Sequence, residues 1–586
     1  MEQESEPISA HVSRDDIHGS NVSSFKGGLW FATIEATRII AYLHAGYLRE
    51  MSQPGSDLKE VLGLSAGTNM RSEPPTVSIL DTTSTVMDLL TRENVGSVVV
   101  VKNDRPVGII TEKDVLERVI RTGKSPELTL AKDVMSEPLV TIVPEQTIAD
   151  ALDMMHKHNI RRLIVEREGI LIGLTTERRL LEIVHGHYLM KATGLPEMMR
   201  GHELQKIRVA YVSTYPPREC GIATYTKHLV DATSTYCARA IGSPAIIAVN
   251  DRGGHYDYEL RVKSQIDSID RQSYEKAAQY INASEMDVVN LQHEFGIFGG
   301  ESGDYVVELL RGIRKPVVTT LHTLLEEPSS HSEKVLELIL QYSDFVVVLA
   351  KAGMTILEQR YGSHADRIRY IPHGCPNVPL IGTEMTKRSL GLADRVVVST
   401  FGLLSRGKGI EYAVRALPAI LKEHPSVLYL IIGQTHPEVR KVEGESYRQL
   451  LLDLVESLGL EKNVRFVNRF LTENELIRYL QATDIYVLPY PNREQISSGT
   501  LTYALSTGKA IVTTPFLQAE EVISSRAALR CDFRAPDSIA ERVNTLLNDN
   551  EIRQSLSRLA YEYSRGMIWP NTAMSYLNVF YHALGL

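Results

Sequence analysis

Two loops of this 586-residue chain end where a helix is expected to begin, a position suited to binding phosphate. The first loop, STYPPRECG, follows an apolar run and ends at Gly221. In the second loop, the letters SSGT place Ser498, Gly499 and Thr500 at the start of a helical pattern. Because the free N–H groups at a helix N-terminus bind anions, both loops indicate sites for phosphate or sugar oxygens.

Around these loops, the sequence from residue 205 onward alternates short apolar runs with amphipathic stretches. IRVAYVST, MDVVNLQ and KPVVTTLH are apolar runs of the first half, and RVVVSTFG, SVLYLIIG and KAIVTT follow in the second half. Apolar strands between helices are typical of a parallel sheet buried on both faces. The pattern predicts two doubly wound, Rossmann-like α/β domains, at 205–382 and 383–570, with ligands at the carboxyl ends of their strands. We expect residues 571–586 to form a helix that packs back on the first domain.

Residues 76–190 contain two copies of one unit, at about 76–130 and 131–190. Asn94 matches Asn159 and Gly108 matches Gly173, each pair 65 positions apart. Each copy reads as helix, strand, turn, strand and helix, and such a repeat predicts two α+β units packed together. Before them, the stretch 65–75 is rich in turn formers and is expected to be a linker. An amphipathic helix at 27–48 is expected within the otherwise unassigned region 1–70.

Composition excludes several classes of protein. The net charge of −9 offers no basic footprint, so no nucleic-acid partner is expected. The four cysteines lack Cys-x-x-Cys spacing, which argues against a zinc site and fits a reducing compartment. The acidic N-terminus does not resemble a secretory signal, and the apolar stretch 27–48 contains charged residues, so no integral membrane segment is expected. A cytoplasmic location follows, and no Asp-x-Asp motif at a strand end calls for a metal.

The turn GIITEKD (108–114) resembles the signature of CBS domains, which bind adenosine nucleotides. The resemblance implies that Asp114 accepts hydrogen bonds from the ribose hydroxyls. It also implies that Thr111 contacts phosphate at a helix N-terminus, with Arg161 or Arg162 helping there. The alternative is that the turn only caps a helix.

The second copy has GLTTERR at the same place, so Arg179 replaces the acidic residue. Because an arginine cannot accept a hydrogen bond, one site for AMP, ADP or ATP is expected rather than two. CBS pairs commonly dimerise through their helices, and the resemblance therefore implies a homodimer.

Residues 206–586 resemble the family 4 glycosyltransferases of GT-B fold. The loop that ends at Gly221 is similar to the first glycine loop of that family, and LQHEFGIFGG and VTTLHT are similar to its two histidine-bearing strand ends. The resemblance implies that His322 forms a hydrogen bond with the donor sugar, and that His293 and Glu294 line the acceptor side. The alternative for either histidine is a satisfied residue at a domain interface.

The loop FGLLSRGKG (401–409) resembles the phosphate loop of the same family, which begins at Gly402. Lys408 matches a lysine that neutralises the departing diphosphate. The arginine that usually follows the first glycine is replaced by Leu403, and Arg406 is expected to reach the phosphates by another path.

The stretch 488–514 aligns with the acidic donor motif Glu-x7-Glu of the family. Gln495 and Tyr503 stand at the two acidic positions, and Glu494 lies one residue from the first. Glu494 is therefore expected to bind the sugar, and Tyr503 to make one hydrogen bond to the ribose. The expected catalytic residues are His322, Lys408 and Glu494.

The resemblance implies a retaining hexosyltransferase that moves a hexose from a nucleoside-diphosphate sugar to a hydroxyl acceptor without a cofactor. UDP-glucose and GDP-mannose are the expected donors, and adenosine nucleotides at the CBS pair are expected to regulate the transfer. Leu403 and Tyr503 leave open a catalytically weak, energy-sensing binding protein. The missing ribose acid also leaves open a glycoside phosphorylase on the same fold.

Overall fold

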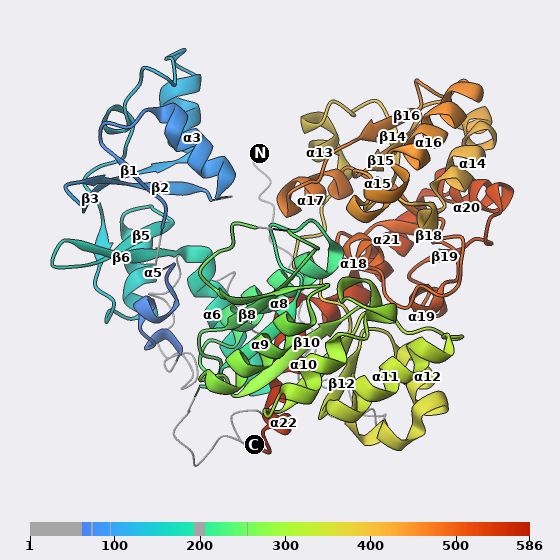
Figure 1. Ribbon diagram of the computed structural model, residues 1–586. Helices are drawn as coiled ribbons and strands as arrows, with labels where there is room; N and C mark the ends of the chain where they lie inside the picture. The colour runs from blue at the N-terminus through green and yellow to red at the C-terminus, as the bar shows by residue number, and fades with distance from the viewer. Residues whose placement is uncertain (1–60, 72–73, 94, 193–205, 255) are drawn as a thin grey trace, which may run out of the picture.

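The computed structural model describes residues 61–71, 74–93, 95–192, 206–254 and 256–586 (Figure 1). They form three units along the chain: the repeat pair, the N-terminal α/β domain from residue 206, and the C-terminal α/β domain from residue 383. The helix expected at 27–48 lies outside the described residues.

The two repeats are built alike, each from a three-stranded sheet covered by a helix. The elements of the first are β1 (Thr76–Ser78), α3 (Thr83–Arg92), β2 (Ser97–Lys102), β3 (Arg105–Thr111) and α4 (Glu112–Val115). Those of the second are β4 (Thr141–Ile142), α5 (Ile148–Lys157), β5 (Arg162–Arg167), β6 (Ile170–Thr176) and α6 (Glu177–Ala192). Val100 stands opposite Gly108 and Val165 opposite Gly173, each followed by a bulge. The predicted repeat is therefore present down to the strand register.

Residues 61–71 form part of the second repeat rather than a linker. Val61, Leu62 and Ala66 are buried in its core. Arg71 pairs with Leu174 on β6, which adds a short extended segment at the edge of the sheet. The prediction of a linker at 65–75 rested on the turn formers there. It overlooked that three apolar side chains just before and among them need a surface to cover.

The N-terminal α/β domain is a seven-stranded sheet in the order β13-β12-β11-β10-β7-β8-β9, parallel throughout. Its strands are β7 (Val209–Ser213), β8 (Ala245–Asn250), β9 (Val262–Asp267), β10 (Val288–His293), β11 (Val317–Leu321), β12 (Phe345–Val348) and β13 (Ile368–Tyr370). Its helices are α8 (Gly221–Tyr236), α9 (Arg271–Ala283), α10 (Val306–Gly312), α11 (Ser330–Tyr342) and α12 (Lys351–Tyr361). The side chains of β7, β10 and β11 are buried along their whole length, which is the burial expected of a sheet covered on both faces.

The C-terminal α/β domain has a six-stranded parallel sheet in the order β16-β15-β14-β17-β18-β19. Its strands are β14 (Val396–Phe401), β15 (Val427–Ile432), β16 (Val464–Val467), β17 (Ile485–Leu488), β18 (Ala510–Thr513) and β19 (Leu529–Arg530). Its helices are α13 (Thr383–Ser389), α14 (Ile410–Glu423), α15 (Pro437–Glu443), α16 (Ser446–Ser457), α17 (Glu473–Gln481), α18 (Gly499–Ser506), α19 (Leu517–Ser524), α20 (Pro536–Asn548) and α21 (Asn550–Ser564). The predicted fold class, two doubly wound parallel-sheet domains after a tandem α+β pair, is confirmed.

The last helix, α22 (Trp569–Ala583), leaves the C-terminal domain and completes the core of the N-terminal domain. Its residues Tyr576, Leu577 and Phe580 are fully buried among side chains of β7 and α8. The Tyr576 hydroxyl lies 2.9 Å from Thr320 Oγ1 and 3.0 Å from the Tyr225 hydroxyl. The helix α22 therefore links the two α/β domains, because it continues the chain of the C-terminal domain and packs in the core of the N-terminal domain.

The repeat pair is fastened to the N-terminal domain through α6, which packs against α8 and α22 (Figure 1).

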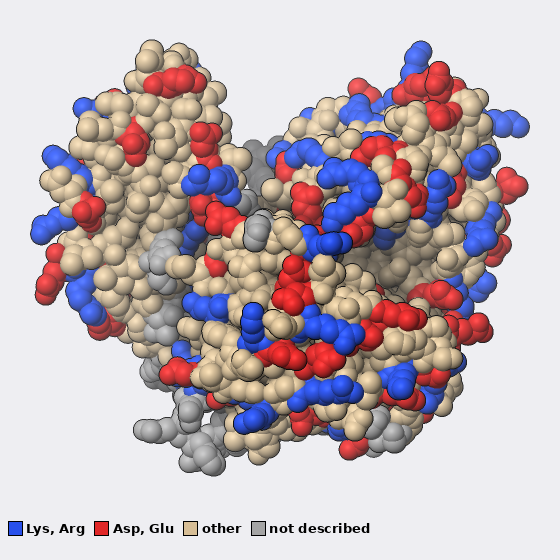
Figure 2. All heavy atoms as spheres, in the orientation of Figure 1, with Lys and Arg blue, Asp and Glu red and all other residues tan. Residues whose placement is uncertain are grey.

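On the face shown in Figure 2, an open notch separates the first repeat from the C-terminal domain, and acidic and basic side chains are interspersed. Within the described residues, no helix combines the length and the apolar character needed to cross a membrane.

Candidate active site

The strand order of each α/β sheet reverses at its centre. In the N-terminal domain β7 and β10 are neighbours, and in the C-terminal domain β14 and β17 are neighbours, with chain connections that diverge from there. Ligands of such sheets bind at the carboxyl ends of strands beside this reversal. The two sets of loops meet, because Ser497 Oγ, before α18, donates a hydrogen bond to the carbonyl oxygen of His322, after β11, at 3.2 Å.

The loop between β14 and α14 is shaped by glycines that bring Lys408 beside the end of β17. Gly409, the N-cap of α14, has a φ of 62°, and a Cβ there would lie 2.1 Å from the carbonyl oxygen of Pro489. Only glycine allows this approach. A Cβ on Gly402 would lie 3.2 Å from the Thr500 side chain and 3.9 Å from Cε of Lys408, so this glycine leaves room between them.

Lys408 ends in a cluster of hydroxyl groups at the N-terminus of α18. Its ammonium group donates to the hydroxyl of Tyr490 at 3.0 Å and lies 4.6 Å from the centre of that ring. The Tyr490 hydroxyl also lies 3.0 Å from both Ser498 Oγ and Thr500 Oγ1. Ser498 caps α18 by accepting a hydrogen bond from the backbone N–H of Leu501. A cation, three hydroxyls and the positive end of a helix are together suited to bind a phosphate group.

The pKa of Tyr490, a side chain that is 2% exposed, reports on the electrostatics of this cluster. Burial raises the pKa of its hydroxyl, but the charge of Lys408 and hydrogen bonds from Lys408, Ser498 and Thr500 together lower the pKa below its ordinary value. Negative charge at this point is therefore stabilised by its surroundings, as a site for anionic oxygen requires.

Arg406 and Glu494, two of the predicted donor-site residues, form no hydrogen bond with this cluster. The Arg406 side chain is exposed and its Nε lies 3.4 Å from Glu443 Oε2. Glu494 is also exposed, in the loop between β17 and α18. The neighbouring Gln495 donates to the carbonyl oxygen of Ser497 at 2.6 Å. The structure thus groups Gly402, Lys408, Ser498, Gly499 and Thr500, and it directs Arg406 toward α15.

Tyr503, at the predicted ribose position, lies on α18 and is 8% exposed. Its hydroxyl donates to Glu473 Oε1 at 2.6 Å, and it lies 3.3 Å from Nδ1 of His228 on α8. A carboxylate therefore stands beside Tyr503, contributed by the first residue of α17. Sequence alignment of one motif could not find Glu473, because it lies 30 residues earlier in the chain.

On the opposite side of the domain interface, a relay of buried amides fixes the protonation of His322. The carbonyl oxygen of Val318 accepts from Asn290 Nδ2 at 3.1 Å, and Asn290 Oδ1 accepts from Gln292 Nε2 at 2.6 Å. Gln292 Oε1 is then left to accept from Nε2 of His322 at 2.8 Å. Because a backbone carbonyl can only accept, this order places the proton of His322 on Nε2 and a lone pair on Nδ1. Nδ1 is thus suited to accept a hydrogen bond from a hydroxyl group.

His322 is 5% exposed and neutral. Burial, with smaller contributions from His373 and His293, lowers its pKa to about 3. Its ring packs edge-on against Tyr225 of α8, with centroids 4.8 Å apart, and Tyr225 makes the same contact with His373. His373 donates from Nδ1 to the carbonyl oxygen of Gly374, and a Cβ on Gly499 would lie 3.3 Å from its Nε2. The segment that links the two domains therefore touches the N-terminus of α18.

The predicted acceptor-side residues lie at the end of β10. His293 is fully buried, stacks on Phe298 at a centroid distance of 5.9 Å, and has no hydrogen-bond partner for either ring nitrogen among the described residues. Burial lowers its pKa to about 3. Glu294 accepts from Thr323 Oγ1 at 2.5 Å. Burial raises the pKa of Glu294, and hydrogen bonds from Thr323 and from backbone N–H groups partly offset this.

Gly221 is the first residue of α8, and a Cβ there would meet no atom within 4 Å. The helix is capped by Cys220, whose Sγ accepts from the backbone N–H of Ala223 at 3.3 Å. The same helix carries Tyr225 and His228, so α8 contributes to the interface with the C-terminal domain at its N-terminus and along its next turns.

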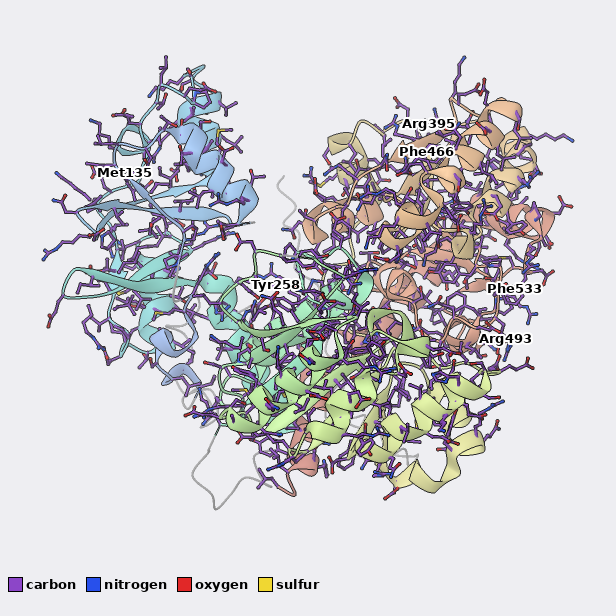
Figure 3. All side chains as sticks on the ribbon, in the orientation of Figure 1. Met135, Tyr258, Arg395, Phe466, Arg493 and Phe533 are labelled. Carbon is purple, nitrogen blue, oxygen red and sulfur yellow. The ribbon has the colours of Figure 1, made fainter. Side chains whose placement is uncertain are left out.

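Two ion pairs and a hydrogen bond also join the two α/β domains. Lys441 Nζ of α15 lies 3.3 Å from Asp251 Oδ2, which follows β8. Arg493, which is labelled in Figure 3, lies in the loop between β17 and α18, and its Nε is 3.4 Å from Glu326 Oε2 of the N-terminal domain. Glu521 of α19 accepts from the backbone N–H of Lys351 at 2.6 Å, at the start of α12. The C-terminal loops are therefore held closely against the N-terminal ones.

In the first repeat, the predicted nucleotide turn forms a capping box. Asp114 Oδ2 accepts from the backbone N–H of Thr111 at 2.8 Å and from its hydroxyl at 2.6 Å, and Oδ1 lies 3.1 Å from Arg118. Arg161 is exposed, 3.7 Å from Glu177. The arrangement agrees with helix capping, and ribose hydroxyls would have to exchange with these partners of Asp114.

Besides Glu473, three further site residues escaped the sequence analysis: Tyr490, Gln292 and Tyr225. Gln292 and its partner Asn290 gave a signal, since two amides interrupt the apolar run VVNLQH on a fully buried strand. A buried polar side chain needs a partner. Tyr490 and Tyr225 gave no such signal, because an aromatic residue at a strand end or on a helix is ordinary in a core.

Comparison with known proteins identifies two kinds of domain in this chain. Residues 383–563 match the family model described as glycosyl transferases group 1. Residues 59–121 and 131–186 each match the CBS domain model. The first CBS match includes residues 61–71, the segment that packs on the second repeat.

An uncharacterized protein of Methanopyrus kandleri is 35% identical over 122 residues, which are 20% of this chain and 62% of that protein. D-inositol 3-phosphate glycosyltransferase of Corynebacterium glutamicum is 26% identical over 302 residues, 47% of this chain and 69% of that protein. The sucrose-phosphate synthase structure from Thermosynechococcus elongatus has 18% identity and a TM-score of 0.54, over 64% of this chain and 99% of that one. This last likeness is one of fold.

Proposed function

We propose that this chain, which carries a group 1 glycosyltransferase domain and a CBS domain pair, transfers a hexose from a nucleoside-diphosphate sugar to a hydroxyl acceptor. One observation carries the proposal. Lys408 and the hydroxyls at the N-terminus of α18 stand on one side of the domain interface, and neutral His322 stands on the other side. An anion site beside a hydrogen-bond acceptor suits a diphosphate joined to a sugar.

In the proposed reaction, the bond between the anomeric carbon and the diphosphate oxygen breaks. The acceptor oxygen bonds to the same face of that carbon, so the configuration is retained, and its proton passes to the departing diphosphate oxygen. Lys408 and the α18 N-terminus stabilise the charge on the leaving group. Nδ1 of His322 accepts a hydrogen bond from a sugar hydroxyl, and Glu494 binds the sugar from the loop before α18.

UDP-glucose and GDP-mannose are the proposed donors. The Corynebacterium relative is named for an inositol 3-phosphate acceptor, which supports a hydroxyl group as the nucleophile. Glu473 beside Tyr503 supports a ribose-binding place at the alignment position where the acidic motif lacks its second carboxylate.

We further propose that adenosine nucleotides bind the CBS pair and change the rate of transfer. The supporting observation is the packing of α6 on α8. α6 begins at the turn of the second repeat, and α8 begins at Gly221 and carries Tyr225. Burial lowers the pKa of Arg179 on α6, while the charges of Glu182 and of Asp231 on α8 act in the opposite direction. A shift of α6 would therefore displace α8, the helix whose Tyr225 contacts His322.

A homodimer formed through the CBS pair remains part of the proposal. Leu116 and Ile120, one helical turn apart, are 60% and 50% exposed after α4. Sedimentation equilibrium of the wild type and of Leu116→Lys tests this, with a shift to monomer expected for the variant.

A catalytically weak, energy-sensing protein is the second candidate. It is favoured by the exposed position of Glu494 and by the ion pair that directs Arg406 away from Lys408. Such a protein would bind sugar nucleotides without turnover. A glycoside phosphorylase would instead use inorganic phosphate and release a sugar phosphate.

The three candidates separate in one assay. Wild-type protein is incubated with UDP-glucose or GDP-mannose and a panel of polyol and sugar acceptors, and in parallel with oligosaccharides and inorganic phosphate. Free nucleoside diphosphate, sugar phosphate and sugar-nucleotide binding are measured. Release that requires an acceptor and yields a new glycoside supports the transferase. Release of sugar phosphate that requires inorganic phosphate would overturn the transferase in favour of the phosphorylase. Binding of the sugar nucleotide without release would overturn it in favour of the energy-sensing protein.

The regulatory part is tested by adding AMP, ADP or ATP to the same assay. Asp114→Ala is expected to abolish the change in rate and the increase in melting temperature that the nucleotide causes. Asp150→Ala is the matched control, because Asp150 forms the same capping box on α5 of the second repeat. Equal nucleotide responses in wild type and Asp114→Ala would contradict the assigned site.

A further inference from the structure

Tyr490 occupies the centre of the hydroxyl cluster, although no sequence motif points to it. Its hydroxyl has three neighbours at 3.0 Å: Lys408 Nζ, Ser498 Oγ and Thr500 Oγ1. Ser498 and Thr500 also lie 2.9 Å from each other. The one hydroxyl therefore connects the β14–α14 loop with the N-terminus of α18, the two segments that make up the proposed phosphate site.

The position of Tyr490 is itself rigid. The side chain is 2% exposed and its ring lies 4.9 Å from that of Phe516, which follows β18. Its carbonyl oxygen accepts from Thr514 Oγ1 at 2.9 Å. The preceding residue, Pro489, is the one against which Gly409 packs. Tyr490 is therefore fixed to the sheet on one side and to the start of α14 on the other.

Lys408 has the opposite character, because its ammonium group ends a flexible stem of four carbons. A free lysine loses considerable rotamer entropy when it takes one position. Two contacts restrict it here: the hydrogen bond to the Tyr490 hydroxyl and the face of the ring, 4.6 Å from Nζ. A cation over an aromatic face is attracted to it. An ammonium group has three N–H donors, so after one is given to Tyr490, two remain for phosphate oxygens.

We propose that Tyr490 is a positioning residue that holds the Lys408 ammonium group and the Ser498 and Thr500 hydroxyls in place for the diphosphate of the donor. The inference rests on the proposed function, since it assigns a residue to the same site. Tyr490 would act through Lys408 and would not itself contact the sugar. The lowered pKa of its hydroxyl agrees with a fixed cation beside it.

The test is a double-mutant cycle on binding, read by isothermal titration of UDP, GDP, uridine and guanosine. The variants are Tyr490→Phe, Lys408→Ala and both together. Tyr490→Phe keeps the ring and leaves Ser498 and Thr500 to bond each other. Tyr429→Phe is the matched control, because the Tyr429 hydroxyl is equally buried and bonds Thr400 at 2.7 Å on the neighbouring strand, outside the cluster.

Tyr490→Phe is expected to weaken diphosphate binding by roughly tenfold and to leave nucleoside binding unchanged. In the Lys408→Ala background, Tyr490→Phe should cause little further loss, because the residue it positions is gone. Tyr429→Phe should bind like the wild type.

Three results would overturn the inference. Losses that add in the double variant would show that Tyr490 does not act through Lys408. Equal losses for diphosphates and nucleosides would indicate general damage to the domain. Tighter diphosphate binding by Tyr490→Phe would mean that the hydroxyl blocks the site. Absence of diphosphate binding by the wild type would instead reject the proposed function, and this inference with it.

Discussion

The two sides of the interface between the α/β domains are built from different chemistry. The C-terminal side presents an ammonium group, hydroxyls and a helix N-terminus around Tyr490 and Ser498. The N-terminal side presents His322 and His293, both neutral and buried among aromatic rings. Both sides lie at the carboxyl ends of parallel sheets with the same topology at their centres.

This difference teaches that the fold supplies the position of a site and the loop residues supply its role. One side can stabilise a developing negative charge, since its groups carry or attract charge. The histidines of the other side are suited to neutral hydroxyl groups, because protonating either histidine would bury an unpaired charge. A diphosphate on one side and a sugar on the other is the division that the physical chemistry favours.

The largest expected effect breaks the charged side. Lys408→Ala should lower kcat by roughly 10²–10³-fold, because it removes the cation that is proposed to stabilise the leaving group. Steady-state kinetics with the preferred donor measure this. Lys422→Ala, at an exposed lysine near the end of α14, is the control and should keep wild-type kcat. Comparable turnover in Lys408→Ala and Lys422→Ala would remove the role assigned to Lys408.

A smaller effect should follow from changing the amide that orients His322. In Gln292→Glu, a carboxylate accepts the hydrogen bond from Nε2 of His322. Its negative charge should raise the pKa of His322 from about 3 toward neutrality. The variant should lose activity as the pH falls from 8 to 6 by roughly tenfold, because the imidazole gains its second proton. The wild type should keep its activity over this range, as far as His322 is concerned.

The control for this pH profile is Gln292→Leu, which removes the acceptor without adding charge. It should lower activity at all pH values and show no new acidic limb. An acidic limb of the same midpoint in both variants would show that the relay does not govern the protonation of His322.

The smallest expected effect concerns stability. Burial holds the pKa of His293 at about 3, below the value of roughly 6.5 in an unfolded chain, so the unfolded state binds more protons between these values. The stability that neutral His293 contributes is present above about pH 6.5 and is lost as the pH falls toward 3. His293→Phe, which can stack on Phe298, should therefore show a smaller fall in melting temperature from pH 7.5 to pH 5.5 than the wild type. A fall of equal size would contradict the burial of a neutral histidine.

Much of the fold could be predicted from the sequence because its signals are local. Alternating apolar runs and amphipathic stretches define the two sheets, and matched glycines such as Gly108 and Gly173 define the repeat. Lys408 and His322 could be proposed as site residues because His322 directly follows β11, and Lys408 lies in the loop between β14 and α14 in a motif of fixed spacing.

The rest depends on contacts between distant parts of the chain. Tyr576 reaches Tyr225 across 351 residues, and Tyr503 reaches His228 across 275. Arg406 was predicted to bind the phosphates because of its place in the loop. In the structure its side chain pairs with Glu443 on α15, and a loop motif gives no sign of this partner. The stretch 65–75 was predicted to be a linker because the partners of its residues lie far along the chain, as in the pairings of Ser65 with Thr147 and of Arg71 with Leu174.

A charged donor side that faces a neutral sugar side should respond differently to Lys408→Ala and to His322→Ala when UDP and GDP are titrated into the two variants. Lys408→Ala should bind the preferred diphosphate at least about tenfold more weakly than the wild type. His322→Ala should bind it within about twofold of the wild type and yet lose most of its turnover. Equal losses of diphosphate affinity in the two variants, or a greater loss in His322→Ala, would contradict the account.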